Sequence, residues 1–261
     1  MRDPAYLRRV QYRDDSNLNA RARLHERFTT MRGTLQGWQF DQFELPARAA
    51  VLEVGCGPGY LWRVNAERVP EGWTCLLSDL STGMVAAARE RLGPRFRYAV
   101  ADAAALPFPD RAFDAVIAHH MLYHVPDRAH AVRELARVLR PDGTLYAQTN
   151  GSAHLRELDE LVSGRWRSDQ LGPGSHAFRL ENGAEQLAAG FARVELRHLP
   201  GELLVTEVEP VVAYVRSMSG EGVDLEPLRH EVAGIIERHG VFRIGTDTGL
   251  FVARAPIQSA T

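Results

Sequence analysis

Three glycines at alternate positions, Gly55, Gly57 and Gly59, are the residues of this chain whose spacing points most directly to chemistry. They end an apolar run within the segment VLEVGCGPGY, residues 51–60. Glycine accepts positive φ and has no Cβ to hold a ligand away, so such a turn lets the backbone approach a ligand closely. Apolar residues resume at helical spacing from Tyr60 onward. A strand, a glycine turn and a helix in this order form the first unit of a nucleotide-binding α/β sheet.

Two carboxylates accompany the turn. Glu53 lies inside the apolar strand, where an unpaired carboxylate would be costly, so it should have a partner. Asp79 follows Gly59 by twenty residues, at the end of the second predicted strand, a position that faces the ribose hydroxyls of a bound nucleoside. The G-x-G-x-G spacing differs from the G-x-G-x-x-G dinucleotide fingerprint, and a chain without lysine has no phosphate-binding P-loop.

A histidine-rich run, His119-His120-Met121-Leu122-Tyr123-His124, follows the fourth predicted strand. The carboxyl ends of strands are where α/β sheets place their ligands, and a histidine of near-neutral pKa can remove a proton from a hydroxyl. His120, His124 and Tyr123 are therefore the candidate catalytic residues, with packing against a ligand or helix capping as the alternative for each. Adjacent side chains of a strand point apart and no carboxylate triad accompanies the histidines, so we expect no metal site.

Strands and helices alternate through the middle of the chain. We expect strands at residues 50–54, 73–77, 96–100, 113–118 and 144–149, and helices at 60–69, from an N-cap at Ser81, and from an N-cap at Asp127. Pro141-Asp142-Gly143 predicts a turn before the fifth strand. This alternation predicts a parallel sheet covered by helices on both faces.

The flanking segments predict a lid and a cap. Residues 2–43 have an amphipathic, helical pattern and precede the first strand, so they should pack over the sheet edge or the ligand crevice. After residue 150 we expect helices at 154–162, 181–189, 209–218 and 225–238, a polar loop at 164–175, and strands at 192–196 and 249–253. The predicted organisation is a helical lid at 1–43, a core at 44–200 and 244–256, and a cap at 201–243. Trp166, Phe178, Tyr214 and Met218 are the aromatic or apolar candidates for lining a substrate cavity, with core packing as the alternative.

Composition narrows the class of protein. The formal net charge of −2 at pH 7 gives no general attraction to nucleic acid or to an anionic membrane. No apolar run approaches the ~20 residues that cross a bilayer, and the charged N-terminal segment lacks the apolar core of a secretory signal. We therefore expect a cytoplasmic protein, a monomer or a homodimer, with no nucleic-acid or membrane partner. Cys56 and Cys75 lack zinc-ligand spacing and should be free thiols.

Four ordered segments together resemble one family. VLEVGCGPGY (51–60), LLSDLSTGM (76–84), ADAAALPFPDRAFDAV (101–116) and ELARVLRPDGTLY (134–146) are similar to class I S-adenosylmethionine-dependent methyltransferases, most closely the small-molecule group known as methyltransferase type 11. The resemblance covers about residues 51–150. It implies S-adenosyl-L-methionine as cofactor and an α/β fold, a Rossmann-like, mostly parallel seven-stranded sheet with an N-terminal helical lid and a helical cap inserted before the last strand.

The resemblance also implies roles for individual residues. Gly55, Gly57 and Gly59 would line the methionine part of the cofactor, together with Cys56 and His119. Glu53 would hold the turn and reach the amino group, and Asp79 would bind the ribose hydroxyls. Leu80 and Met84 would lie against the adenine, whose amino group and ring nitrogen Asp102 and Ala103 would contact. In the N-terminal lid, Tyr12 or Arg21 could meet the methionine carboxylate, although a solvated helix face explains that polar run equally well.

These features predict methyl transfer from S-adenosyl-L-methionine to an oxygen, nitrogen or carbon nucleophile of a small metabolite, such as one of secondary metabolism, without a metal. The alternative is a protein of the same fold that binds the cofactor without methylating, either a rearrangement catalyst or a regulatory subunit. A nicotinamide-dependent dehydrogenase is disfavoured by the glycine spacing and by the absence of lysine.

Overall fold

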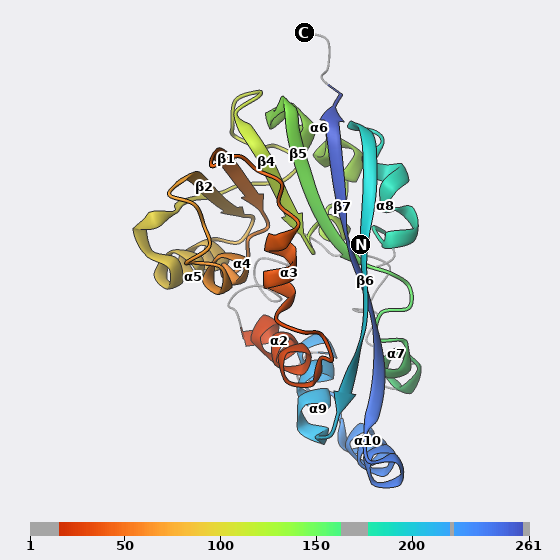
Figure 1. The fold of residues 1–261 in the computed structure, drawn as a ribbon. Coiled ribbons are helices and arrows are strands. Elements are labelled where there is room, and N and C mark those ends of the chain that lie inside the picture. The colour runs from red at the N-terminus through yellow and green to blue at the C-terminus, as the bar shows by residue number, and fades with distance from the viewer. Residues whose placement is uncertain (1–15, 163–176, 220–221, 258–261) are drawn as a thin grey trace.

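The sheet has seven strands in the order β3-β2-β1-β4-β5-β7-β6 in a computed structural model that describes residues 16–162, 177–219 and 222–257 (Figure 1). Neighbouring strands from β3 to β5 are parallel, and β7 is antiparallel to both β5 and β6. This confirms the predicted Rossmann-like, mostly parallel seven-stranded sheet. The strands are β1 Arg48–Val54, β2 Gly72–Asp79, β3 Arg97–Val100, β4 Phe113–His119, β5 Leu139–Asn150, β6 Phe191–Val205 and β7 Phe242–Pro256.

Helices cover both faces of the sheet. Successive strand residues point to opposite sides, so each face carries apolar side chains that a layer of helices buries. Leu52 and Val54 face one side, where they join α6 and α8 in one apolar cluster. Val51 faces the other side, which is covered by α3, α4 and α5. The helices of the described chain are α2 Ser16–Phe28, α3 Leu35–Asp41, α4 Tyr60–Val64, α5 Thr82–Leu92, α6 Arg128–Val138, α7 Arg156–Val162, α8 Leu180–Leu187, α9 Val208–Ser219 and α10 Glu226–His239.

Both predicted N-caps are present. The Ser81 side chain accepts a hydrogen bond from the backbone N–H of Met84 at 3.3 Å, and Asp127 accepts one from His130 at 3.0 Å. These bonds satisfy backbone donors that the first turn of a helix leaves unpaired, so they fix where α5 and α6 begin.

Two local predictions are wrong. The helix expected at 60–69 ends at Val64, because the Asn65 side chain donates to the carbonyl of Leu61 at 2.8 Å and closes the last turn. The turn expected at Pro141-Asp142-Gly143 before the fifth strand is absent, because these three residues lie within β5. Phe113 of β4 pairs with Leu139 of β5, and the next pair is Ala115 with Thr144. Two residues of β4 therefore lie opposite five of β5, and Pro141-Asp142-Gly143 belong to this irregularity in β5.

The part of the N-terminal segment that the structure describes, residues 16–43, contains two helices, α2 and α3, with a turn between them. After α2 ends at Phe28, Thr29 forms an antiparallel bridge with Leu203 of β6. Gly33, at φ +85°, then turns the chain into α3, where Thr34 provides the N-cap. Leu24 and Phe28 of α2 are buried against the far end of the β6–β7 pair.

The β6–β7 pair is much longer than the strands predicted at 192–196 and 249–253. Its register runs without interruption from Arg193 opposite Arg254 to Val205 opposite Phe242. The outer half extends beyond the rest of the sheet and has α9 and α10 at its tip (Figure 1). A separate apolar cluster forms there from α2, α7, α9, α10 and the ends of both strands. The inserted helices therefore pack on a two-stranded ribbon and share their core with α2.

Two glycines inside helices provide a direct test of this packing. A Cβ on Gly183 of α8 would lie 2.4 Å from Cε2 of the buried Phe251, whereas one on Gly234 of α10 would meet only the far end of the Arg238 side chain, at 3.1 Å. We expect Gly183→Ala to lower the free energy of unfolding by about 1–3 kcal/mol through overpacking. Gly234→Ala should raise it by about 0.5–1 kcal/mol, because alanine loses less conformational entropy in a helix. Urea denaturation of the two variants measures both effects, and equal shifts would contradict the packing of α8 against β7.

Candidate active site

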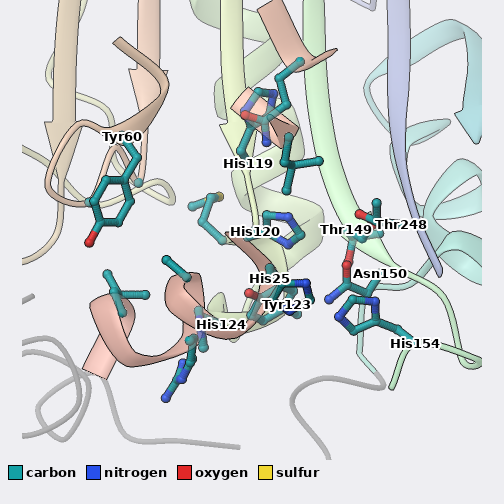
Figure 2. A pocket seen from close by; sticks show the side chains of 18 of the residues that line it. His25, Tyr60, His119, His120, Tyr123, His124, Thr149, Asn150, His154 and Thr248 are labelled. Atoms are coloured by element: carbon teal, nitrogen blue, oxygen red, sulfur yellow. The ribbon is translucent and has the colours of Figure 1, made fainter. Parts of the chain in front are cut away.

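A cavity of about 1370 Å³ opens at the carboxyl ends of the parallel strands (Figure 2). Its wall includes the glycine turn after β1, the start of α5 after β2, the residues after β3, the histidine run after β4 and residues 149–151 after β5. Residues of α2 and α9 close it from the side of the ribbon. Typical ligand pockets measure about 300–1,000 Å³, so this cavity has room for a cofactor and a second small molecule.

The three glycines of the turn have different surroundings, although each has positive φ. A Cβ on Gly55 would lie 2.7 Å from Cβ of Met121, and one on Gly59 would lie 2.6 Å from Cδ1 of Leu92. Gly59 is not among the residues that line the cavity, and its missing side chain makes room for α5. Among the described residues, a Cβ on Gly57 would have only Leu18 within 4 Å, at 3.9 Å, so the space next to the Cα of Gly57 is open cavity.

Both carboxylates of the sequence prediction lie beneath this turn. The buried Glu53 accepts a hydrogen bond from the indole N–H of Trp62 at 2.6 Å, which is the partner that its burial requires. Burial raises the pKa of Glu53 to about 8. Asp79 accepts hydrogen bonds from the backbone N–H groups of Gly57, at 3.0 Å, and Ser81, at 2.8 Å. Burial also raises the pKa of Asp79, while these backbone donors oppose the shift.

The raised pKa of Glu53 predicts how stability changes with pH. In the unfolded chain Glu53 ionises near its ordinary pKa of 4.5, whereas in the folded protein it stays protonated until about pH 8. The folded state therefore binds the extra proton between these values, and stability is lost as the pH rises through this window. We expect the free energy of unfolding of the wild type to fall relative to Glu53→Gln from pH 5 to pH 8, by up to about 1.4 kcal/mol per pH unit. Urea denaturation across this range measures the difference, and parallel profiles would contradict it.

The residues expected around the adenine line the same cavity. Leu80 and Met84 contribute apolar surface after β2, and Asp102 and Ala103 follow β3. The Asp102 carboxylate accepts a hydrogen bond from the backbone N–H of Ala104 at 2.9 Å, which fixes its orientation at the end of the strand. Cys56 also lines the cavity as a free thiol, and burial raises its pKa well above the ordinary value.

The histidine run turns sharply as β4 ends. His119 is the last residue of the strand, and both nitrogens of its ring are buried without a hydrogen-bond partner in the described part of the protein. Burial lowers the pKa of His119 to about 3. His120 has φ +53°, a conformation that costs a non-glycine residue about 1–3 kcal/mol. Its backbone N–H donates to Gln148 at 2.9 Å, which holds this conformation while the ring lines the cavity.

The other two candidate catalytic residues, Tyr123 and His124, belong to a 3-10 turn, Leu122–His124, after β4. Their rings meet edge to face with centroids 4.5 Å apart, and both line the cavity. The structure thus brings all three candidates, His120, Tyr123 and His124, to one wall.

Two histidines that sequence reasoning missed lie beside His120 (Figure 2). His25 comes from α2 and His154 from the segment after β5, and their rings are stacked with centroids 5.6 Å apart and planes 9° apart. Asn150 of β5 adds a buried amide oxygen that has no partner among the residues described here. These residues are far apart in the chain and carry no motif, so no local signal could have identified them.

The N-terminal candidates have mixed outcomes. Tyr12 lies outside the described residues. Arg21 lines the cavity, but its guanidinium donates to Oγ of Ser217 at 3.1 Å and to the carbonyl of the same residue at 3.0 Å, so its hydrogen bonds tie α2 to α9.

Of the four cavity-lining candidates from the sequence, Tyr214 and Met218 of α9 do line the cavity. Phe178 instead packs edge to face against Phe251 in the core. Trp166 falls outside the part of the chain that the structure describes.

Metal-binding and membrane-spanning features are both missing from the described ranges, 16–162, 177–219 and 222–257. These ranges contain no group of three or more His, Cys, Asp or Glu side chains arranged to hold a metal ion. None of their helices has the length and apolar character needed to cross a membrane.

Comparison with known proteins supports the sequence interpretation. Residues 52–147 match the family model described as "Methyltransferase domain". The chain is 34% identical over 137 residues to Methyltransferase GfsG of Streptomyces halstedii, covering 51% of this chain and 46% of that protein. It is 34% identical over 128 residues to the ubiquinone/menaquinone biosynthesis C-methyltransferase UbiE of Hahella chejuensis, covering 47% of each. The chain spans about half the length of the curated relatives it matches.

Among solved structures, BH2331 from Bacillus halodurans has a TM-score of 0.63 and 20% identity, covering 86% of this chain and all of that chain. At this identity the similarity shows the fold alone. The family match, which covers the segments that carry the resemblance, confirms a class I methyltransferase domain over residues 52–147 and bears out S-adenosyl-L-methionine as its cofactor.

Proposed function

We propose that this chain, whose residues 52–147 are a class I S-adenosylmethionine-dependent methyltransferase domain, transfers a methyl group from that cofactor to a small molecule held in the cavity. The observation that carries the proposal is the position of the glycine turn, Asp79 and the histidine run around one cavity large enough for two ligands. The domain match supports the donor, and the enclosure supports a small acceptor.

The residues at the glycine turn fit the cofactor. Gly57 leaves open space next to its Cα, and Asp79 fixes the turn while facing the cavity where ribose hydroxyls would bind. The unpartnered ring of His119 offers one donor and one acceptor to a ligand. Bound there, S-adenosyl-L-methionine supplies a methyl group on a positively charged sulfur. The protein then has to orient the acceptor, exclude water and, for a protic nucleophile, accept a proton.

The other end of the cavity fits a small acceptor with an oxygen, nitrogen or carbon nucleophile. There α2 and α9 act as lid and cap, joined by the hydrogen bonds from Arg21 to Ser217. A site closed in this way suits a metabolite better than a macromolecule. The name of one curated relative supports the same class, since it is a ubiquinone/menaquinone biosynthesis C-methyltransferase. His120, His124 and Tyr123 are the residues placed to receive a proton without a metal ion.

Calorimetric titration tests the donor, and transfer of radiolabelled methyl tests the reaction. We expect S-adenosyl-L-methionine and S-adenosyl-L-homocysteine to bind and NAD not to bind. Purified protein incubated with methyl-labelled cofactor and a library of small phenols, enols and amines should then yield a labelled product. Tight binding of NAD alone would overturn the proposed donor. Binding of both sulfur nucleosides with no labelled product from any acceptor would favour the non-methylating alternative.

A further inference from the structure

Three imidazoles from distant parts of the chain meet at the end of the cavity away from Tyr60 and the glycine turn (Figure 2). His25 projects from α2, His120 follows β4, and His154 follows β5. The stack of His25 on His154 brings lid and sheet together, and the left-handed backbone of His120 turns its ring toward them. The proposed function gives the ring of His120 a role but leaves the other two without one.

All three rings are neutral at physiological pH. Burial lowers the pKa of His25 and of His120 to about 4, and lowers that of His154 well below its ordinary value. A proton on one ring would also repel a proton on its neighbours. The other titratable groups that line the cavity around the cluster are Arg21 and Glu26 of α2, Asp159 of α7, Tyr214 of α9, His119 at the end of β4, and Tyr123 and His124 after it. An uncharged cluster has no favourable ion pair to offer a carboxylate or phosphate.

At the end of the cavity that holds the three histidines, the described residues leave one hydrogen-bond donor, on His154, and one acceptor, on Asn150, for a ligand. The backbone N–H of Asp247 donates to Nδ1 of His154 at 3.2 Å, so Nε2 of that ring carries the hydrogen and is a donor. The hydroxyls of Thr149 and Thr248 are already engaged, donating to the carbonyls of Phe178 and Thr149 at 2.9 and 3.1 Å. The buried Oδ1 of Asn150 remains an acceptor without a partner in the described ranges.

We propose that His25, His120 and His154 form a subsite that binds a neutral hydroxyl of the methyl acceptor, that of a phenol or an enol. In an acceptor that carries a second donor group, Asn150 accepts a hydrogen bond from that group. A hydroxyl donates one hydrogen bond and accepts others, which matches neutral imidazoles better than a carboxylate or an ammonium does. The inference rests on the proposed function, because it assigns the acceptor class for that reaction.

Within the subsite the three rings have different tasks. His120 lies after the strand that ends beside the glycine turn, so its ring is the one placed to hold the hydroxyl proton at its free nitrogen. His25 and His154 are positioning residues that stack on each other and offer a donor from the opposite wall. A cationic cofactor bound at the glycine turn would further disfavour a charged ring, which keeps the cluster neutral until the acceptor is bound.

Three probes with the same ring system test the subsite: 2-naphthol, 2-naphthoate and 2-methylnaphthalene, each titrated into protein saturated with S-adenosyl-L-homocysteine. We expect 2-naphthol to bind about 5- to 10-fold more tightly than either of the others, the factor that one or two hydrogen bonds provide. The preference should fall below about twofold in His25→Phe and His154→Phe, which keep an aromatic ring and remove its nitrogens. His130→Phe, at an exposed position of α6, is the matched control and should retain it.

A second measurement keeps the test independent of how well the variants fold. In the wild type labelled with ¹³C at histidine, the ring signals of the three residues should not titrate above about pH 5. The conservative variant His25→Asn should raise the pKa of His120, because it removes a neighbouring ring that lowers this pKa. Equal affinity for the three probes, or a naphthol preference that survives in both phenylalanine variants, would overturn the subsite. Failure of S-adenosyl-L-homocysteine to bind in the same titration would instead overturn the proposed function.

Discussion

The Asp79→Ala variant is expected to bind S-adenosyl-L-methionine at least about 100-fold more weakly than the wild type. Asp79 holds the backbone of the glycine turn through Gly57 at 3.0 Å and the start of α5 through Ser81 at 2.8 Å. Hydrogen bonds to a charged acceptor contribute about 1.5–3 kcal/mol each, and tenfold in affinity corresponds to about 1.4 kcal/mol. The variant removes both the anchor of the turn and the proposed acceptor for two ribose hydroxyls. Calorimetry measures the affinity, and a thermal melt checks that the variant is folded.

The control for this prediction is Asp41→Ala, which removes an exposed carboxylate paired with Arg68. An exposed ion pair contributes at most about 1 kcal/mol, and Asp41 does not line the cavity, so its loss should leave the affinity unchanged. Asp79→Asn should lie between the wild type and Asp79→Ala, because an amide keeps one oxygen acceptor. A folded Asp79→Ala variant with wild-type affinity would show that the cofactor is not held at this carboxylate.

The second large effect is expected for Gly57→Ala. Gly57 has φ +52°, and a Cβ there would project into open cavity. Gly240, which follows α10, has φ +74°, would place a Cβ with nothing within 4 Å, and does not line the cavity. Alanine at either position adopts a left-handed backbone at a cost of about 1–2 kcal/mol, so both variants should lose similar stability. Only Gly57→Ala should also weaken binding of S-adenosyl-L-methionine, by about 10- to 100-fold, because the added methyl group crowds the ligand.

This pair separates backbone strain from obstruction of the cavity. Denaturation gives the stability of each variant and calorimetry gives its affinity for the cofactor. If Gly57→Ala binds as tightly as Gly240→Ala, the cofactor does not approach the turn at its central glycine.

The parts of the fold that the sequence predicted are those fixed by local rules. Glycine spacing, the N-caps at Ser81 and Asp127 and the alternation of strands and helices each depend on a few neighbouring residues. The sequence predicted that the buried Glu53 has a partner. It could not identify Trp62 as that partner, because this depends on how α4 packs. The cofactor end of the cavity follows from such local rules, because most of the proposed contacts lie at the end of a strand or in the segment that follows it.

The acceptor end could not be predicted in the same way. His25 of α2 stacks on His154 of the segment after β5, a long-range arrangement without a local pattern. The strands predicted at 192–196 and 249–253 covered only the part of β6 and β7 that lies in the sheet. Apart from the bridge between Thr29 and Leu203, the extensions pair with each other in the described part of the chain. They combine exposed with buried residues, so they lack the continuous apolar run of a central strand. The division of the N-terminal segment into α2 and α3 depends on the bridge from Thr29 to a strand far along the chain.

The β6–β7 ribbon sets how far α9 lies from the glycine turn, and under the proposed function it therefore sets the depth of the acceptor end of the cavity. A strand advances by about 3.4 Å per residue, and an even-numbered insertion leaves each side chain on its original face. Two residues added to each strand of the ribbon would thus carry α9, with Tyr214 and Met218, about 7 Å outward. Under the proposed function, the depth of the cavity at α9 can thus change in steps of about 7 Å without any change in residues 52–147. Because α2 packs on α9, a longer ribbon would require a matching change in the segment that holds α2, and under the proposed function the two changes together would set the length of the accepted molecule.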